Sequence, residues 1–204
     1  MEATVRMGGW TFVGRSIALA LVAGAASAAT SQWRLVDLGT LGGPGSYGAA
    51  ISQSGAVVGC ADRADGTVHA FLYLNGAMRD LDAGSNDPGS SCALAVNDSG
   101  VVAGRSATGM LVVWNGASVT SLNVAGDVGG IDSRGVVVGS YRDGTSTIAF
   151  RYADGALRAI AGPGSAATGI NSRGQVAGTA DGRAFIYESG TLRDLGTLGG
   201  ARSS

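Results

Sequence analysis

The sequence contains no lysine and only one histidine, and both scarcities exclude kinds of site. A histidine-based metal site or a Ser-His-Asp relay would have to rest on His69 alone. Because related segments carry Met110, Ile148 and Arg183 at the same strand position, we interpret His69 as structural. All 14 basic residues are arginines and lie scattered, whereas nucleic-acid binding normally needs a clustered basic face. We expect no catalytic constellation, no metal, no cofactor and no nucleic-acid partner.

Glycine, by contrast, is abundant, with 36 residues of 204, and it recurs at regular intervals. Residues 37–43 return unchanged as residues 194–200, and three weaker echoes lie between them at 80–82, 121–123 and 159–161. The steps are 43, 41, 38 and 35 residues long. A period of about 40 residues indicates a repeat architecture. We therefore expect a β-repeat domain at 29–204, with repeats at approximately 44–82, 83–123, 124–161 and 162–200.

Each repeat shows the same succession of short strands and turns. An apolar run enters a polar turn that ends in glycine, at residues 51–55, 96–100, 131–135 and 170–174. We expect an Asn, Asp or Ser side chain three places before the glycine to bond the backbone, and the glycine to accept a positive φ. A valine-rich strand, a strand ending in an aromatic residue and a short fourth strand follow. We interpret the recurring aromatics as core residues rather than a carbohydrate-stacking platform; they are Tyr73, Trp114, Tyr152 and Tyr187.

Four short antiparallel strands in about 40 residues predict an all-β fold, a β-propeller-like array of four-stranded antiparallel blades. A β-solenoid is the alternative, because its coils also alternate short strands with glycine turns, although these coils are usually shorter. Residues 33–43 have the pattern of a fourth strand without three preceding strands, and residues 194–200 have that of an opening fifth unit. We therefore expect an incomplete ring, whose unpaired edges lead to end-to-end self-association.

Several segments carry a family resemblance. Residues 69–71 read His-Ala-Phe, identical segments flank the repeats at 37–43 and 194–200, and residues 170–178 have the pattern Ile-Asn-x-x-Gly-x-Val-x-Gly. In these features the chain resembles the bacterial extracellular repeat proteins named for the His-Ala-Phe signature, the HAF repeats. Repeat two departs from the signature at residues 110–112, and only repeat one keeps the histidine. The resemblance implies a secreted repeat protein and no assigned activity.

The first 28 residues have the composition of a secretory signal peptide. Arg6 and Arg15 precede an apolar run at 17–25, and small residues at 26–28 suit a signal peptidase. The apolar run is about half of the roughly 20 residues that a membrane-spanning helix needs. We expect an extracellular or periplasmic protein with no transmembrane segment in its mature chain.

Export permits oxidation of the two cysteines. Cys60 follows the expected second strand of repeat one, and Cys92 precedes the expected first strand of repeat two. The end of a second strand and the start of a first strand share a face of an antiparallel blade, so the two thiols can meet across neighbouring repeats. We therefore predict a disulfide between Cys60 and Cys92, with two separate buried thiols as the alternative.

Two hypotheses of function remain. The first is a noncatalytic binding or structural module of the cell envelope or extracellular space, whose partner is a glycan, a protein or a surface. The second is a propeller-type polysaccharide hydrolase or lyase; glycosidic cleavage usually needs two carboxylates about 5 to 10 Å apart. We interpret the acidic loop at 62–66 as a solvated turn rather than a calcium site. The candidate loop residues all follow second strands and are Asp62, Arg63, Asp65, Arg142, Asp143 and Asp181.

Overall fold

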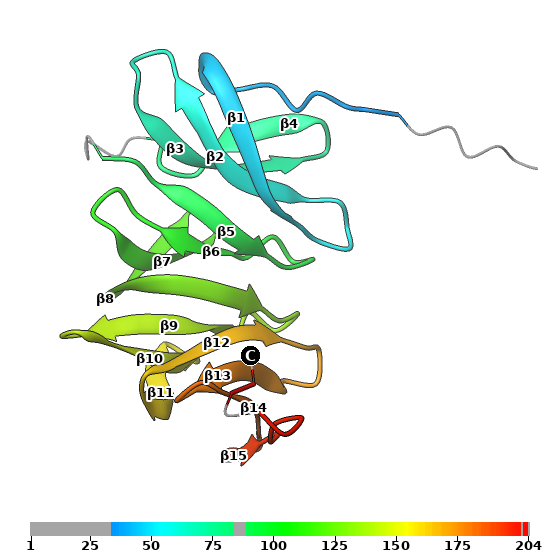
Figure 1. Ribbon diagram of the computed structural model, residues 1–204. Helices are drawn as coiled ribbons and strands as arrows, with labels where there is room; N and C mark the ends of the chain where they lie inside the picture. The colour runs from blue at the N-terminus through cyan, green and yellow to red at the C-terminus, as the bar shows by residue number, and fades with distance from the viewer. Residues whose placement is uncertain (1–33, 84–88, 201, 204) are drawn as a thin grey trace, which may run out of the picture. The chain divides into compact units, whose positions relative to one another are not determined.

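The computed structural model describes residues 34–83, 89–200 and 202–203. The expected signal peptide at 1–28 lies outside these residues. The described chain contains fifteen β-strands and no helix, and all the strands belong to one compact unit, Asp37–Ser204. They form three antiparallel sheets of four, seven and four strands (Figure 1). The prediction of an all-β fold is therefore confirmed.

The first and third sheets are meanders, in which each strand pairs with the next strand along the chain. The first sheet consists of β1 (Gly42–Ile51), β2 (Val57–Arg63), β3 (Val68–Leu74) and β4 (Ala77–Asp80). The third sheet consists of β12 (Ser165–Ile170), β13 (Val176–Ala180), β14 (Arg183–Glu188) and β15 (Thr191–Asp194).

The middle sheet has seven strands because one long strand serves two repeats. The strand β8 pairs with β7 as far as Ala125 and with β9 from Gly126 onward. Each half of β8 therefore acts as one strand of a meander, and every repeat contributes four antiparallel strands. The sheet consists of β5 (Cys92–Val96), β6 (Val102–Arg105), β7 (Met110–Asn115), β8 (Ser118–Ile131), β9 (Val137–Asp143), β10 (Ser146–Ala153) and β11 (Ala156–Pro163).

The strand predicted at 33–43 is wrong for the described part of that segment. Residues 34–40 form no strand, and β1 starts at Gly42 as the first strand of repeat one. The side chains of Asp37 and Thr40 instead accept hydrogen bonds from the N–H groups of Gly39 and Gly42, at 2.9 and 3.2 Å. Both glycines have a positive φ, so local turns replace a strand ladder here.

A bulge in the first strand of each repeat lies opposite a glycine of the second strand. In repeat three the pairing shifts between Val128 and Gly130, and a Cβ on Gly139 would clash with the carbonyl oxygen of Asp127. The buried ring of Phe150 also lies 3.0 Å from the position that this Cβ would take. Close approach of the neighbouring backbone thus requires glycine at the end of each valine-rich run. The corresponding residues in the other repeats are Gly59, Gly104 and Gly178.

The hydrophobic core lies between repeats. One cluster joins Val58 and Leu72 of repeat one to Val96 and Trp114 of repeat two. Two further clusters join repeat two to repeat three and repeat three to repeat four in the same way. Because a single repeat of this kind cannot bury its apolar face by itself, stability depends on contact between neighbours.

The recurring aromatic residues contribute to this core. Trp114 is buried, and its indole N–H donates a hydrogen bond to Oδ1 of Asp82 at 3.2 Å. Tyr152 and Tyr187 pack against the other two clusters, and Tyr73 is half-buried. The interpretation as core residues is confirmed for the three that join the clusters.

Candidate functional site

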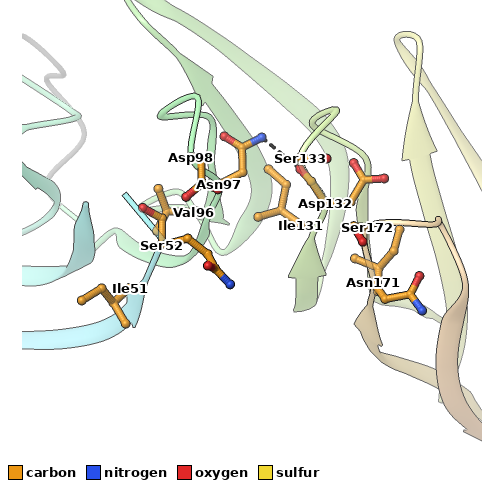
Figure 2. A pocket seen from close by; sticks show the side chains of 12 residues that line it. Ile51, Ser52, Val96, Asn97, Asp98, Ile131, Asp132, Ser133, Asn171 and Ser172 are labelled. Atoms are coloured by element: carbon orange, nitrogen blue, oxygen red, sulfur yellow. Dashed lines mark hydrogen bonds between the residues drawn. The ribbon is translucent and has the colours of Figure 1, made fainter. Parts of the chain in front are cut away.

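An open depression of about 380 Å³ is lined by the turns between the first and second strands of all four repeats. Each repeat contributes the apolar last residue of its first strand and the two polar residues that follow. Figure 2 shows the side chains of these turns following one another across the site. The lining residues are Ile51, Ser52 and Gln53, then Val96, Asn97 and Asp98, then Ile131, Asp132 and Ser133, and finally Ile170, Asn171 and Ser172.

The first polar residue of each turn fixes the turn. In repeat two, Oδ1 of Asn97 accepts hydrogen bonds from the N–H groups of Ser99 and Val101 at 3.1 and 3.0 Å. These bonds satisfy backbone donors at the start of the next strand, as predicted from the sequence. Side-chain bonds of the same kind form in the other repeats through Ser52, Asp132 and Asn171. Each turn ends in a glycine with positive φ, at Gly55, Gly100, Gly135 and Gly174.

The second polar residue of each turn is exposed to solvent. These positions carry an amide, a carboxylate and two hydroxyls, on Gln53, Asp98, Ser133 and Ser172. The depression therefore presents hydrogen-bond donors and acceptors beside apolar side chains. Such a surface suits a ligand that has both hydroxyl groups and apolar C–H faces.

Hydrogen bonds between neighbouring turns hold the depression together. The buried side-chain amide of Asn97 donates to the carbonyl oxygen of Asp132 at 3.0 Å (Figure 2). Between repeats one and two, the N–H of Ser54 donates to Oδ1 of Asp98 at 2.8 Å. The fully buried carboxylate of Asp132 also receives two bonds from the guanidinium of Arg134, at 3.0 and 2.7 Å. The lining is thus fixed by contacts that need no ligand.

The candidate loop residues from the sequence lie away from this depression, where second strands lead to third strands. Their predicted position in loops is wrong for four of the six: Asp62 and Arg63 are the last residues of β2, and Arg142 and Asp143 are the last residues of β9, whereas Asp65 and Asp181 lie in turns. There the structure brings Arg63 and Asp65 together, with 2.8 Å between Nη1 and Oδ2. Nε of Arg63 also lies 3.5 Å from a carboxylate oxygen of Asp80. The remaining candidates, Asp62, Arg142, Asp143 and Asp181, make no ion pair among the described residues.

The acidic loop at 62–66 is the tight connection between β2 and β3. The N–H of Gly66 donates to the carbonyl of Arg63 at 3.0 Å. Oδ1 of Asp65 accepts a hydrogen bond from the hydroxyl of Thr67 at 2.6 Å and one from its N–H at 3.0 Å. These two bonds, the hydroxyl first, hold the pKa of Asp65 below its ordinary value. In the described ranges, no three His, Cys, Asp or Glu side chains are placed to hold a metal ion.

His69 is buried, 3% exposed, and forms a hydrogen-bonding contact within its own repeat. Its Nδ1 lies 3.0 Å from both carboxylate oxygens of Asp80. In repeat four the same two strand positions carry Arg183 and Asp194, with 2.7 Å between Nε and Oδ2. Replacement of the histidine by arginine in an equivalent pair favours the structural interpretation, since arginine cannot act as a general base at neutral pH.

The predicted disulfide between Cys60 and Cys92 is present, with 4.8 Å between the two Cα atoms. Cys60 lies within β2 and Cys92 opens β5, so both cysteines are strand residues rather than neighbours of strands. The bond joins the second strand of repeat one to the first strand of repeat two. A disulfide of this kind is typical of proteins in oxidising compartments.

Sequence reasoning located the four lining turns but gave them only a structural role. Repetition was the signal that could have identified the site: equivalent turns in successive repeats lie on one side of an array, so their exposed residues form a common surface.

No protein-family model matches this chain, and no curated protein is significantly similar to it. Within the part of the chain that the structure describes, no helix is long and apolar enough to cross a membrane.

Proposed function

We propose that the protein is an exported, noncatalytic repeat module that binds a neutral, hydroxyl-rich ligand, such as a glycan, in the depression formed by the four first turns. The observation that carries this proposal is the contribution of each repeat to the depression, an apolar residue and an exposed polar residue at equivalent positions. Repeated subsites suit a polymer made of repeated units. Binding is then the sum of several weak contacts.

Binding is better supported than catalysis because several titratable groups have structural partners. His69 pairs with Asp80, Asp65 receives bonds from Thr67 and Arg63, and Asp132 is held by Arg134. The acids singled out from the sequence for a hydrolase or lyase lie where second strands lead to third strands, apart from the depression. The depression itself is lined by two aspartates, but Asp132 is buried and bonded to Arg134, which leaves Asp98 as the one exposed carboxylate in that lining. Among the described residues, the enzyme hypothesis therefore lacks a pair of exposed carboxylates at this site.

The repeats are propeller-like blades in this proposal. Support comes from the antiparallel meander in every repeat, from core clusters that span neighbouring repeats, and from the position of the depression at the ends of the first strands. Strands of a stacked solenoid would pair from coil to coil, whereas the strand ladders here run within repeats, apart from the shared strand β8. The residues that resemble HAF repeats fit the same reading of a secreted protein.

Export is supported by two independent features. The sequence at 1–28 has the pattern of a signal peptide, and the disulfide between Cys60 and Cys92 requires oxidation. An envelope or extracellular location would also give the depression access to polysaccharides.

A glycan array probed with protein purified from the secreted fraction tests the proposal, followed by calorimetric titration of any ligand that binds. The double substitution Gln53→Ala with Ser133→Ala removes two exposed hydrogen-bonding groups from the depression. We expect at least a tenfold loss of affinity, since each bond contributes about 1 kcal/mol. The matched control, Asp143→Ala with Asp181→Ala, should bind as the wild type does.

Three results would contradict the proposal. Affinity lost in the control but kept in the depression variant would move the site to the second-to-third turns. Release of reducing ends or unsaturated sugars from a polysaccharide would favour the hydrolase or lyase. Binding to no glycan would exclude this ligand class and leave a protein or a surface as the partner.

A further inference from the structure

An arginine occupies a packing position on the face of repeat three that meets repeat four. Arg151 follows Ala149 by two places in β10, so both side chains lie on the same face of the sheet, and Ala149 belongs to the core cluster that joins the two repeats. Arg151 itself is half-buried. The equivalent residues of the other repeats are all apolar, and they are Leu72, Val113 and Ile186. The first two of these are buried in core clusters. A charged side chain therefore stands where other repeats place packing residues.

The charge of Arg151 has no ion-pair partner within the described ranges of the chain. Arg158 lies directly opposite on β11 and is also without one there. Like charges in this relation destabilise a sheet, because their Cβ atoms are only about 5 Å apart. In the other repeats the same cross-strand pair contains at most one arginine; the pairs are Leu72 with Arg79, Val113 with Thr120 and Ile186 with Arg193. Repeat three thus bears a repulsion that no ion pair in the described chain offsets.

An open hollow of about 160 Å³ adjoins Arg151. It is lined by residues 134–136, before and at the start of β9, and by Arg151, Ala153 and Asp154 at the end of β10. The side chain of Arg134 is 56% exposed, and its Nε and Nη2 bond Asp132, so Nη1 stays available to a ligand. The hollow has room for a small anion and a few waters, since a water molecule occupies about 30 Å³ in the liquid.

The charges around this hollow favour an anion. The guanidinium groups of Arg134, Arg151 and Arg158 outnumber the two nearby carboxylates, Asp132 and Asp154. Asp132 is buried and bonded to Arg134, whereas Asp154 is exposed, so its repulsion of an anion is screened by water. Guanidinium groups are planar forks of N–H donors that match the oxygen atoms of sulfate, phosphate and carboxylate groups.

We propose that this hollow, which we call the arginine hollow, binds an oxyanion group through Arg134 and Arg151, with Arg158 at its edge. The bound anion pairs with the half-buried charge of Arg151 and offsets its repulsion by Arg158. None of the residues that line the arginine hollow lines the depression, so the site does not depend on the glycan proposed above. The oxyanion group belongs either to a free anion or to an acidic sugar.

NMR titration of the oxidised, ¹⁵N-labelled protein tests this proposal, with inorganic sulfate and glucose 6-sulfate as probes and sodium chloride keeping the ionic strength constant. We expect saturable shifts of the backbone N–H groups at 134–136 and 153–154. Tighter binding of glucose 6-sulfate would assign the site to an acidic sugar, and equal or weaker binding would assign it to a free anion. Sulfate carries the oxyanion chemistry in both probes, so either result supports the site.

The substitution Arg151→Leu installs the residue that repeat one has at this position. It should weaken sulfate binding about tenfold or more, because hydrogen bonds to a charged group are lost. It should also raise the urea midpoint of unfolding, since the pair of like charges disappears. A purely structural arginine would change stability alone. Asp154→Asn removes the carboxylate from the lining and should tighten sulfate binding.

Arg142→Leu is the matched control, because it removes the same charge from an exposed side chain at the other end of β9. Its sulfate affinity should equal that of the wild type. Arg151→Gln keeps most of the side-chain length and provides a second variant should Arg151→Leu fold poorly. The proposal would be overturned by the absence of saturable shifts with both probes, by wild-type affinity in the folded Arg151 variants, or by an equal loss in Arg142→Leu.

Discussion

Cys60 in β2 is bonded to Cys92 in β5, and this pair defines a position that recurs at each interface between repeats. At the next interface the same two strand positions carry Arg105 and Asp127, which form an ion pair. At the last interface they carry Ser140 and Ala166. The same pair of positions is therefore joined by a covalent bond at the first interface and by an ion pair at the second, and it carries two small side chains at the third.

This equivalence predicts that a disulfide can be introduced at the last interface. The double substitution Ser140→Cys with Ala166→Cys should oxidise without rearrangement of the backbone, because the native pair already bridges the equivalent positions with 4.8 Å between its Cα atoms. On the loop-entropy model the new bridge contributes about 3 kcal/mol to the free energy of unfolding. Mass spectrometry under non-reducing conditions checks the bond. Two free thiols in the oxidised protein would show that the interfaces are not equivalent.

The disulfide between Cys60 and Cys92 should contribute more to the free energy of unfolding than the ion pair between Arg105 and Asp127. Replacing Cys60 and Cys92 by serine should lower the free energy of unfolding by about 3 to 4 kcal/mol, because the unfolded chain loses its constraint. Arg105→Ala should cost less than about 1 kcal/mol, since both side chains of that ion pair are about half exposed and screened by solvent. Denaturant unfolding measures the stability loss of each variant, and unfolding of the wild type with a reductant checks the contribution of the disulfide. Equal losses would contradict the ranking.

The fold could be predicted where a local rule decides the structure. The turns at 96–100 and 131–135 were predictable because Asn97 and Asp132 bond their own backbone and glycine takes the positive φ. The predicted strand at 33–43 failed because a strand needs a partner. Residues 191–194 form β15 by pairing with β14, whereas the matching residues 34–37 form no strand in the described part of the chain.

The long strand β8 and the depression depend on tertiary contacts that no single segment encodes. Residues 121–125 contain no glycine to form a turn. The fourth strand of repeat two therefore continues into the first strand of repeat three. The exposed residues of the site, such as Ser133 and Ser172, have no distinctive pattern of their own. Only the packing of neighbouring repeats places them around one depression.

The glycine opposite each bulge should be intolerant of a side chain. Gly139→Ala would place a Cβ against the carbonyl oxygen of Asp127 and the ring of Phe150, and we expect a loss of about 2 to 3 kcal/mol. Gly162→Ala is the matched control, because no atom lies within 4 Å of its Cβ position. That change should stay within about 0.5 kcal/mol of the wild type. Thermal or denaturant unfolding distinguishes the two; similar values for both variants would mean that the strands can move apart at no cost.

The pKa of Asp65 should depend on the hydroxyl of Thr67. Thr67→Val removes the largest cause of the lowered pKa and leaves the backbone bond, so the pKa should rise toward its ordinary value. Because folding lowers this pKa, ionised Asp65 favours the folded state above its ordinary pKa, and that contribution disappears as the pH falls through the folded-state pKa. An NMR titration of the carboxyl carbon measures the shift. An unchanged pKa in the variant would assign the effect to the backbone bond.

The amide of Asn97 should stabilise the contact between repeats two and three. Asn97→Asp keeps the oxygen that caps the turn but replaces the donor to the carbonyl of Asp132 by an oxygen. A buried carboxylate then faces a carbonyl oxygen without a hydrogen between them, and we expect a loss of about 2 to 3 kcal/mol. Urea unfolding of the folded variant provides the measurement.

Asn171→Asp supplies the matched control for this prediction. Asn171 caps the equivalent turn of repeat four through the same oxygen, but it is exposed, and its amide donates a hydrogen bond to the half-buried side chain of Gln175 within that repeat. Its substitution should therefore cost less than about 1 kcal/mol, since water can replace the lost bond. If both variants lost equal stability, the energetic role of Asn97 would lie in the turn. A loss confined to Asn97→Asp would place it in the buried contact between repeats, which Asn171 does not make.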